Sequence, residues 1–104
     1  MTQPANAFRG EASLPVNGSE RILRPTFTAL VAAEEELGPL FALVERAGVS
    51  RLALSEMTAL FWHCLEDRSD LDREEFGEAV VELGLARCAR PLRAILGQIL
   101  QGAP

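Results

Sequence analysis

The chain has 104 residues, a formal net charge of -5, and a composition that is 48% hydrophobic and 24% charged, which is typical of one globular domain. An acidic chain repels phosphate, so nucleic-acid binding would need a local concentration of its ten basic residues, all of which are arginine. The sequence has no secretory signal and no apolar run of about 18 residues, so we expect a cytoplasmic protein with no membrane partner.

The chain divides into a short polar start and one folded unit. We expect residues 1–8 to form a flexible tail and residues 9–104 to form a single domain. Within that domain, a β-hairpin at about 10–25 precedes four or five short helices at about 27–101. The predicted fold class is therefore α+β, with the hairpin packed on a helical bundle.

The hairpin is predicted from an alternating run, ASLPV, followed by Asn17-Gly18, two residues that tolerate positive φ. A two-residue loop would place Leu23 on the apolar face of the hairpin. A three-residue loop would place Ile22 there instead, and the sequence leaves both registers open. Because Pro15 has no N–H to donate, we expect its strand to lie at an edge.

The first helix is predicted over about 27–37, with Thr26 as its N-cap and Gly38 as its end. Its expected buried stripe consists of Phe27, Leu30, Val31 and Leu37.

Three consecutive glutamates, Glu34, Glu35 and Glu36, close this helix, where carboxylates oppose the helix dipole. At 100° per residue, Glu34 falls within the apolar stripe and the other two fall outside it. The favoured interpretation is a half-buried Glu34 paired with Arg24 or Arg46. The alternative is that the acidic run binds a partner.

Two helices follow, one over about 39–47 that Gly48 ends, and one over about 55–66. The second of these carries Trp62-His63-Cys64. Adjacent helical residues point about 100° apart, so His63 is badly placed to deprotonate Cys64.

The same residues are poor candidates for a metal centre. A zinc site would need His63, Cys64 and Cys88 without any of the usual ligand spacings. We therefore expect both cysteines to be core residues. We expect no bound metal, no cofactor and no catalytic activity. Trp62 is expected to cover the edge of the core or to mark a contact surface.

The next helix has the clearest start, because Asp72 and Glu75 have the spacing of a capping box; it should end near Leu83. The last segment, 85–101, keeps one apolar stripe. Pro91 interrupts it, so the helix either kinks there or is split into two.

Arg87, Arg90 and Arg93 lie opposite that stripe. They could bind phosphates or an acidic protein, or they could form a solvated face partly paired with Glu78 and Glu82. A helix-turn-helix remains the alternative, which would make the protein a small prophage-type DNA-binding regulator. Its candidate recognition helix, REEFGEAVVEL, is acidic where it should meet phosphate.

The ordered motifs RGEASL…NG, TFTALVAAEEELG, ALFWHCL and GEAVVELGLA…PLRAIL make the chain resemble the small gene transfer agent family proteins of phage-like tails, over about residues 9–101. The resemblance implies a non-enzymatic role in tail morphogenesis, as a tail-tube-associated protein or a tail assembly chaperone. The implied partners are tail proteins, such as tail tube and tape measure, or other copies of the chain, and incorporation into a phage-like particle is a further expectation. The matching positions are interpreted as fold and interface positions: Gly10, Glu11, Leu30, Glu34, Leu37 and Gly38.

This resemblance suggests how the hairpin would act, since free strand edges can add a strand to a partner's sheet. The residues expected to contact partners are those of the acidic run, the tryptophan and the arginine row: Glu34, Glu35, Glu36, Trp62, Arg87, Arg90 and Arg93.

Overall fold

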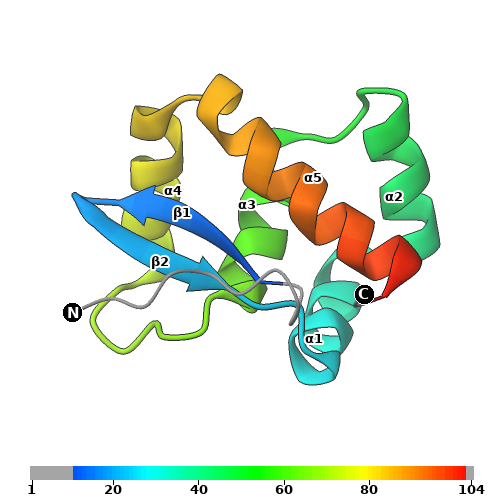
Figure 1. Ribbon diagram of the computed structural model, residues 1–104, viewed down its shortest axis with the longest axis horizontal. Coiled ribbons are helices and arrows are strands. Elements are labelled where there is room, and N and C mark those ends of the chain that lie inside the picture. The colour runs from blue at the N-terminus through cyan, green and yellow to red at the C-terminus, as the bar shows by residue number, and fades with distance from the viewer. Residues whose placement is uncertain (1–10, 103–104) are drawn as a thin grey trace.

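The computed structural model describes residues 11–102 and consists of a two-stranded antiparallel hairpin followed by five helices (Figure 1). This confirms the predicted α+β class. The expected tail over residues 1–8 lies outside the described residues. The elements are β1 (Ala12–Val16), β2 (Ser19–Leu23), α1 (Phe27–Leu37), α2 (Leu40–Gly48), α3 (Leu54–Cys64), α4 (Arg73–Leu83) and α5 (Leu85–Gln101).

The hairpin has the two-residue loop. Val16 pairs with Ser19, and the loop residues Asn17 and Gly18 have φ values of 51° and 82°. Positive φ at both positions is the signature of a type I′ turn, whose twist matches that of the strands. This register places Leu23 in the core, where it is fully buried.

The outer edge of β2 is covered by the chain that follows α3. Leu65 forms a bridge with Leu23, and the N–H of Glu66 donates to the carbonyl of Ile22 at 3.0 Å. These bonds explain why α3 ends at Cys64 and not at Glu66, as the periodicity had suggested. The expectation of two free hairpin edges is therefore wrong for β2.

Within residues 11–102, β1 has no second neighbouring strand, as Pro15 predicted. In the observed register, the backbone groups of Ser13 and Pro15 point away from β2. Since Pro15 has no N–H, only part of this edge could bond a partner strand.

Helix α1 is rotated relative to the prediction. Phe27 is 84% exposed and Val31 is at the surface, so neither belongs to the core. The buried side is formed by smaller residues at the same helical spacing: Ala29, Leu30, Ala33 and Leu37. Small side chains at the two alanine positions allow close packing of α1, whose main contact is α3.

Four predicted helix ends are confirmed. The hydroxyl of Thr26 accepts a hydrogen bond from the N–H of Ala29 at 3.1 Å. Gly38 and Gly84 end α1 and α4 with positive φ, and each donates its N–H to the carbonyl four residues earlier. The capping box of α4 is also present, since the Asp72 carboxylate accepts from the N–H of Glu75 at 2.8 Å.

The end of α2 differs from the prediction. Gly48 is the last helical residue, and Ser50 takes the left-handed conformation with φ 59°. The N–H groups of Ser50 and Arg51 donate to the carbonyls of Ala47 and Arg46, at 3.1 and 2.7 Å. These two bonds form a Schellman motif in which a serine holds the position that glycine usually occupies.

Helix α5 is continuous through Pro91. The proline ring is buried together with Cys88 and Ile95 on the side that faces the protein. One hydrophobic cluster receives side chains from both strands and all five helices. Figure 1 shows α3 near the centre of this arrangement, with the hairpin and α2 at opposite ends and α5 crossing between them. No helix between residues 11 and 102 has the length and apolar character that a membrane crossing requires.

Candidate protein-contact surface

The three glutamates at the end of α1 point in three directions, because successive helical residues are rotated by about 100°. The structure gives each a different environment.

Glu36 joins three helices. Its carboxylate accepts hydrogen bonds from both terminal nitrogens of Arg73 on α4, and from Nε2 of His63 on α3 at 2.8 Å. The hydrogen bonds from Arg73, followed by that from His63, lower the pKa of Glu36 to about 2. The two basic groups offset the unfavourable position of this carboxylate at the helix C-terminus.

Glu34 supplies the N-terminal cap of the next helix. Its Oε2 accepts a hydrogen bond from the backbone N–H of Leu40 at 3.0 Å. Pro39, the N-cap residue of α2, has no side chain that can accept such a bond. A carboxylate at a helix N-terminus is also favoured by the helix dipole.

The expected ion pair of Glu34 with Arg24 or Arg46 is therefore wrong. Glu34 is exposed. Arg24 lies 3.6 Å from Glu11, whose side chain is 7% exposed, and Arg46 pairs with Glu56. The shielded carboxylate beside an arginine, which was expected in α1, is instead that of Glu11, just before β1.

Glu35 is the glutamate of this run that has no partner among the described residues. It is exposed and lies on the outward side of α1 with Phe27 and Val31. Phe41, in the first turn of α2, is 82% exposed. We call Phe27, Val31, Glu35, Phe41 and Glu45 the aromatic–acidic surface.

Trp62 lies at the edge of the core. Its ring is 5.9 Å from that of Phe76, at an interplanar angle of 48°. The guanidinium of Arg68 lies over the indole, 5.1 Å from its centroid, and donates to the Trp62 carbonyl at 3.2 Å. The arginine and the phenylalanine cover much of the indole, which leaves it half-buried.

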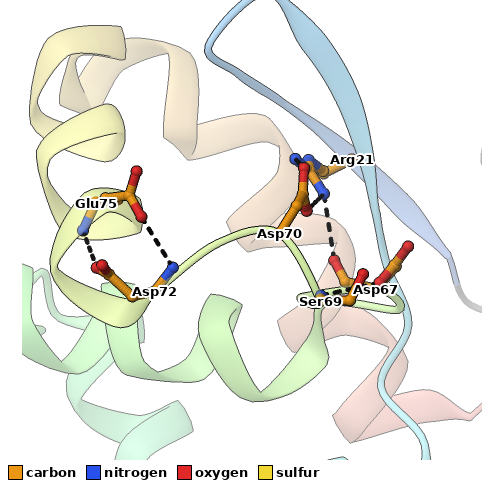
Figure 2. Close-up of polar contacts among 6 residues, drawn as sticks. All are labelled: Arg21, Asp67, Ser69, Asp70, Asp72 and Glu75. Atoms are coloured by element: carbon orange, nitrogen blue, oxygen red, sulfur yellow. Dashed lines mark hydrogen bonds and ion pairs between the residues drawn. The ribbon is translucent and has the colours of Figure 1, made fainter.

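A polar contact that sequence reasoning missed fixes the loop between α3 and α4 (Figure 2). Arg21 on β2 forms a bidentate pair with Asp70, at 2.9 and 2.8 Å, and also donates to the Asp67 carbonyl at 3.4 Å. Its Nε is buried and has no partner in the structure. The available signal was the hairpin register, because Arg21 pairs with Leu14 and so shares the core-facing side of the sheet.

Arg87, Arg90 and Arg93 are exposed on α5, and none has a hydrogen-bond or ion-pair partner among the described residues. The expected pairing with Glu78 and Glu82 is therefore not formed. On α4, the outward side carries Glu74, Glu78 and Glu82. Such a helix would repel DNA phosphates, which argues against the helix-turn-helix alternative.

The groups with potential for chemistry are engaged elsewhere or inaccessible. His63 bonds to Glu36, whereas Cys64 and Cys88 are free thiols buried in the core. Burial raises the pKa of both thiols, and that of Cys64 reaches about 12. Within residues 11–102, no three His, Cys, Asp or Glu side chains are grouped so that they could hold a metal ion.

A family model described as "Phage tail tube protein, GTA-gp10" matches residues 9–102. The comparisons with curated proteins and with solved structures gave no match. The family match covers every described helix and strand, so it applies to the whole fold and not to one motif.

Proposed function

The chain belongs to the phage tail tube protein family from gene transfer agents, and on that premise we propose that it acts without catalysis at the tail tube, through contacts with other tail proteins. The observation that carries this proposal is the match over residues 9–102. The engagement of His63 and the burial of both thiols support a role without catalysis.

The protein composition of the particle distinguishes a tube-associated subunit from a tail assembly chaperone. Particles should be purified from a producing strain and their proteins quantified by mass spectrometry. A tube-associated subunit is present in the finished particle at a fixed ratio to the other tail proteins. A tail assembly chaperone is present in the producing cells but absent from the particle.

Deletion of the gene tests the role itself. We expect electron microscopy of the deletion strain to show heads without complete tails, and expression of the chain from a plasmid to restore the tails. Normal tails in the deletion strain would refute the proposal.

A further inference from the structure

Two phenylalanines are the most exposed large apolar residues among those described. Phe27 is 84% exposed and Phe41 is 82% exposed, although each begins a helix whose other side packs against the core. Exposed aromatic side chains are enriched at interface centres, where they provide much of the binding energy.

The two rings lie on adjoining helices that are connected by a contact of Glu34. Phe27, Val31 and Glu34 follow one another at spacings of four and three residues, so they form one stripe along α1. The Glu34 carboxylate contacts the N–H of Leu40, the residue that precedes Phe41. This contact therefore joins the end of the stripe on α1 to the first turn of α2, where Phe41 is exposed.

The unpaired charges of the aromatic–acidic surface are negative, although Arg46 and Arg51 line a hollow with Glu45, and Arg46 is paired with Glu56. Glu35 lies on the outward side of α1, and Glu45 follows Phe41 by one helical turn; both are exposed and lack an ion-pair partner within residues 11–102. The last turn of α1 contains no basic residue of its own, and the basic groups of Arg73 and His63 beside it bond to Glu36 and not to Glu35.

We propose that the aromatic–acidic surface docks a segment of another tail protein in which large apolar side chains are flanked by arginine or lysine. The proposal rests on the proposed function and names the kind of partner. Apolar side chains of the partner cover the phenylalanine rings, and its basic groups pair with Glu35 and Glu45. Opposite charges at the rim speed association and select the partner, so binding weakens as salt is raised.

The test uses an array of overlapping peptides from the tail proteins of the same particle, with the purified chain as ligand. We expect the bound peptides to combine large apolar residues with arginine or lysine. The strongest peptide is then measured by fluorescence anisotropy. The double variant Phe27→Ala/Phe41→Ala should bind this peptide at least tenfold more weakly. Glu35→Arg should also weaken binding and remove much of the salt dependence of the affinity.

A matched control is available where α4 meets α5. Val81 and Leu85 are also exposed, and Val81→Ala/Leu85→Ala should bind like the unchanged protein. All variants replace exposed side chains, so circular dichroism and urea midpoints should show that they fold.

Three outcomes would overturn the inference: no peptide binds, the bound peptides are acidic, or the phenylalanine variant binds as well as the control. Sedimentation velocity tests whether a second copy of the chain occupies this surface instead. If the unchanged chain self-associates and only the Phe27→Ala/Phe41→Ala variant is monomeric, the surface binds a second copy and not a different protein. Each of these results leaves the deletion phenotype as a separate test of the proposed function.

Discussion

Arg73 donates to both carboxylate oxygens of Glu36, which ties the last turn of α1 to the first turn of α4, 37 positions along the chain. His63 adds a third donor from α3. The dipole of α1 alone would disfavour a carboxylate at this C-terminus. The bonds from Arg73 and His63 compensate for that effect, so Glu36 connects three helices.

Removal of the Glu36 charge should weaken this connection between helices. Glu36→Gln should lower the free energy of unfolding by about 0.5–1 kcal/mol, a value reduced for solvent screening because the side chain is 35% exposed. Glu35→Gln, one residue away and without a partner, should change it by less than about 0.5 kcal/mol. Urea melts of both variants make the comparison, and equal midpoints would show that the pair contributes nothing to stability.

The contribution of Glu36 should depend on pH. Its pKa is about 2 in the folded protein and has an ordinary value of 4.5, so its contribution is complete above about pH 4.5 and is lost as pH falls toward 2. The difference in stability between the unchanged protein and Glu36→Gln should therefore be largest at pH 6 and shrink at pH 2.5. Thermal melts at the two pH values test this, and a difference that grows on acidification would contradict the assignment.

Ser50 is the position at which glycine should improve the protein. Its φ of 59° strains any residue with a β-carbon, so Ser50→Gly should stabilise the protein by about 0.5–1 kcal/mol. The matched control is Ser55→Gly, the same change in the first turn of α3, which should destabilise by about 0.5 kcal/mol. The opposite signs distinguish the turn geometry from a general effect of glycine on the unfolded chain.

The contact between Arg21 and Asp70 should show an asymmetry. Asp70→Asn leaves a partly buried guanidinium without its carboxylate, whereas Arg21→Met keeps the apolar stem and also removes the buried Nε that has no partner. We expect Asp70→Asn to lower the urea midpoint more than Arg21→Met. The reverse order would mean that Arg21 stabilises the fold through contacts other than its pair with Asp70, such as its bond to the Asp67 carbonyl.

Both thiols should be unreactive in the folded protein. Cys64 and Cys88 are almost completely buried, and burial raises the pKa of each. A thiol reagent such as DTNB should modify neither residue at pH 8 until urea unfolds the chain, and then modify both. Rapid modification of one thiol in the absence of urea would reveal an accessible nucleophile.

Local signals in the sequence were sufficient to place most helix boundaries. Thr26, Asp72 with Glu75, and Gly84 act through bonds to residues three or four positions away, so their effect can be inferred from spacing alone. The rotation of α1 could not be inferred in that way. Its buried side depends on how α1 packs against α3, and this packing buries Ala33 and leaves Phe27 exposed.

The same distinction between local spacing and tertiary packing applies to the three glutamates of α1. Local spacing separated Glu34, Glu35 and Glu36 onto different sides of α1 but did not show which one would find an arginine. That depends on Arg73, which lies beside Glu36 because α1 and α4 both pack against α3. To predict the role of Glu34, one would need to know where Leu40 lies after the turn at Gly38. Helical periodicity does not describe that turn.

The packing of the hairpin has a consequence for synthesis on the ribosome. Strand β1 is translated first, yet the helices that contact it, α4 and α5, are translated last. Leu14 and Val16, both fully buried in the folded protein, therefore remain uncovered in the nascent chain until most of it has left the exit tunnel. Ribosome-bound chains stalled before residue 85 should resist proteolysis poorly, and chains stalled far enough beyond residue 101 should resist it well, because the first segment made is the last to be covered.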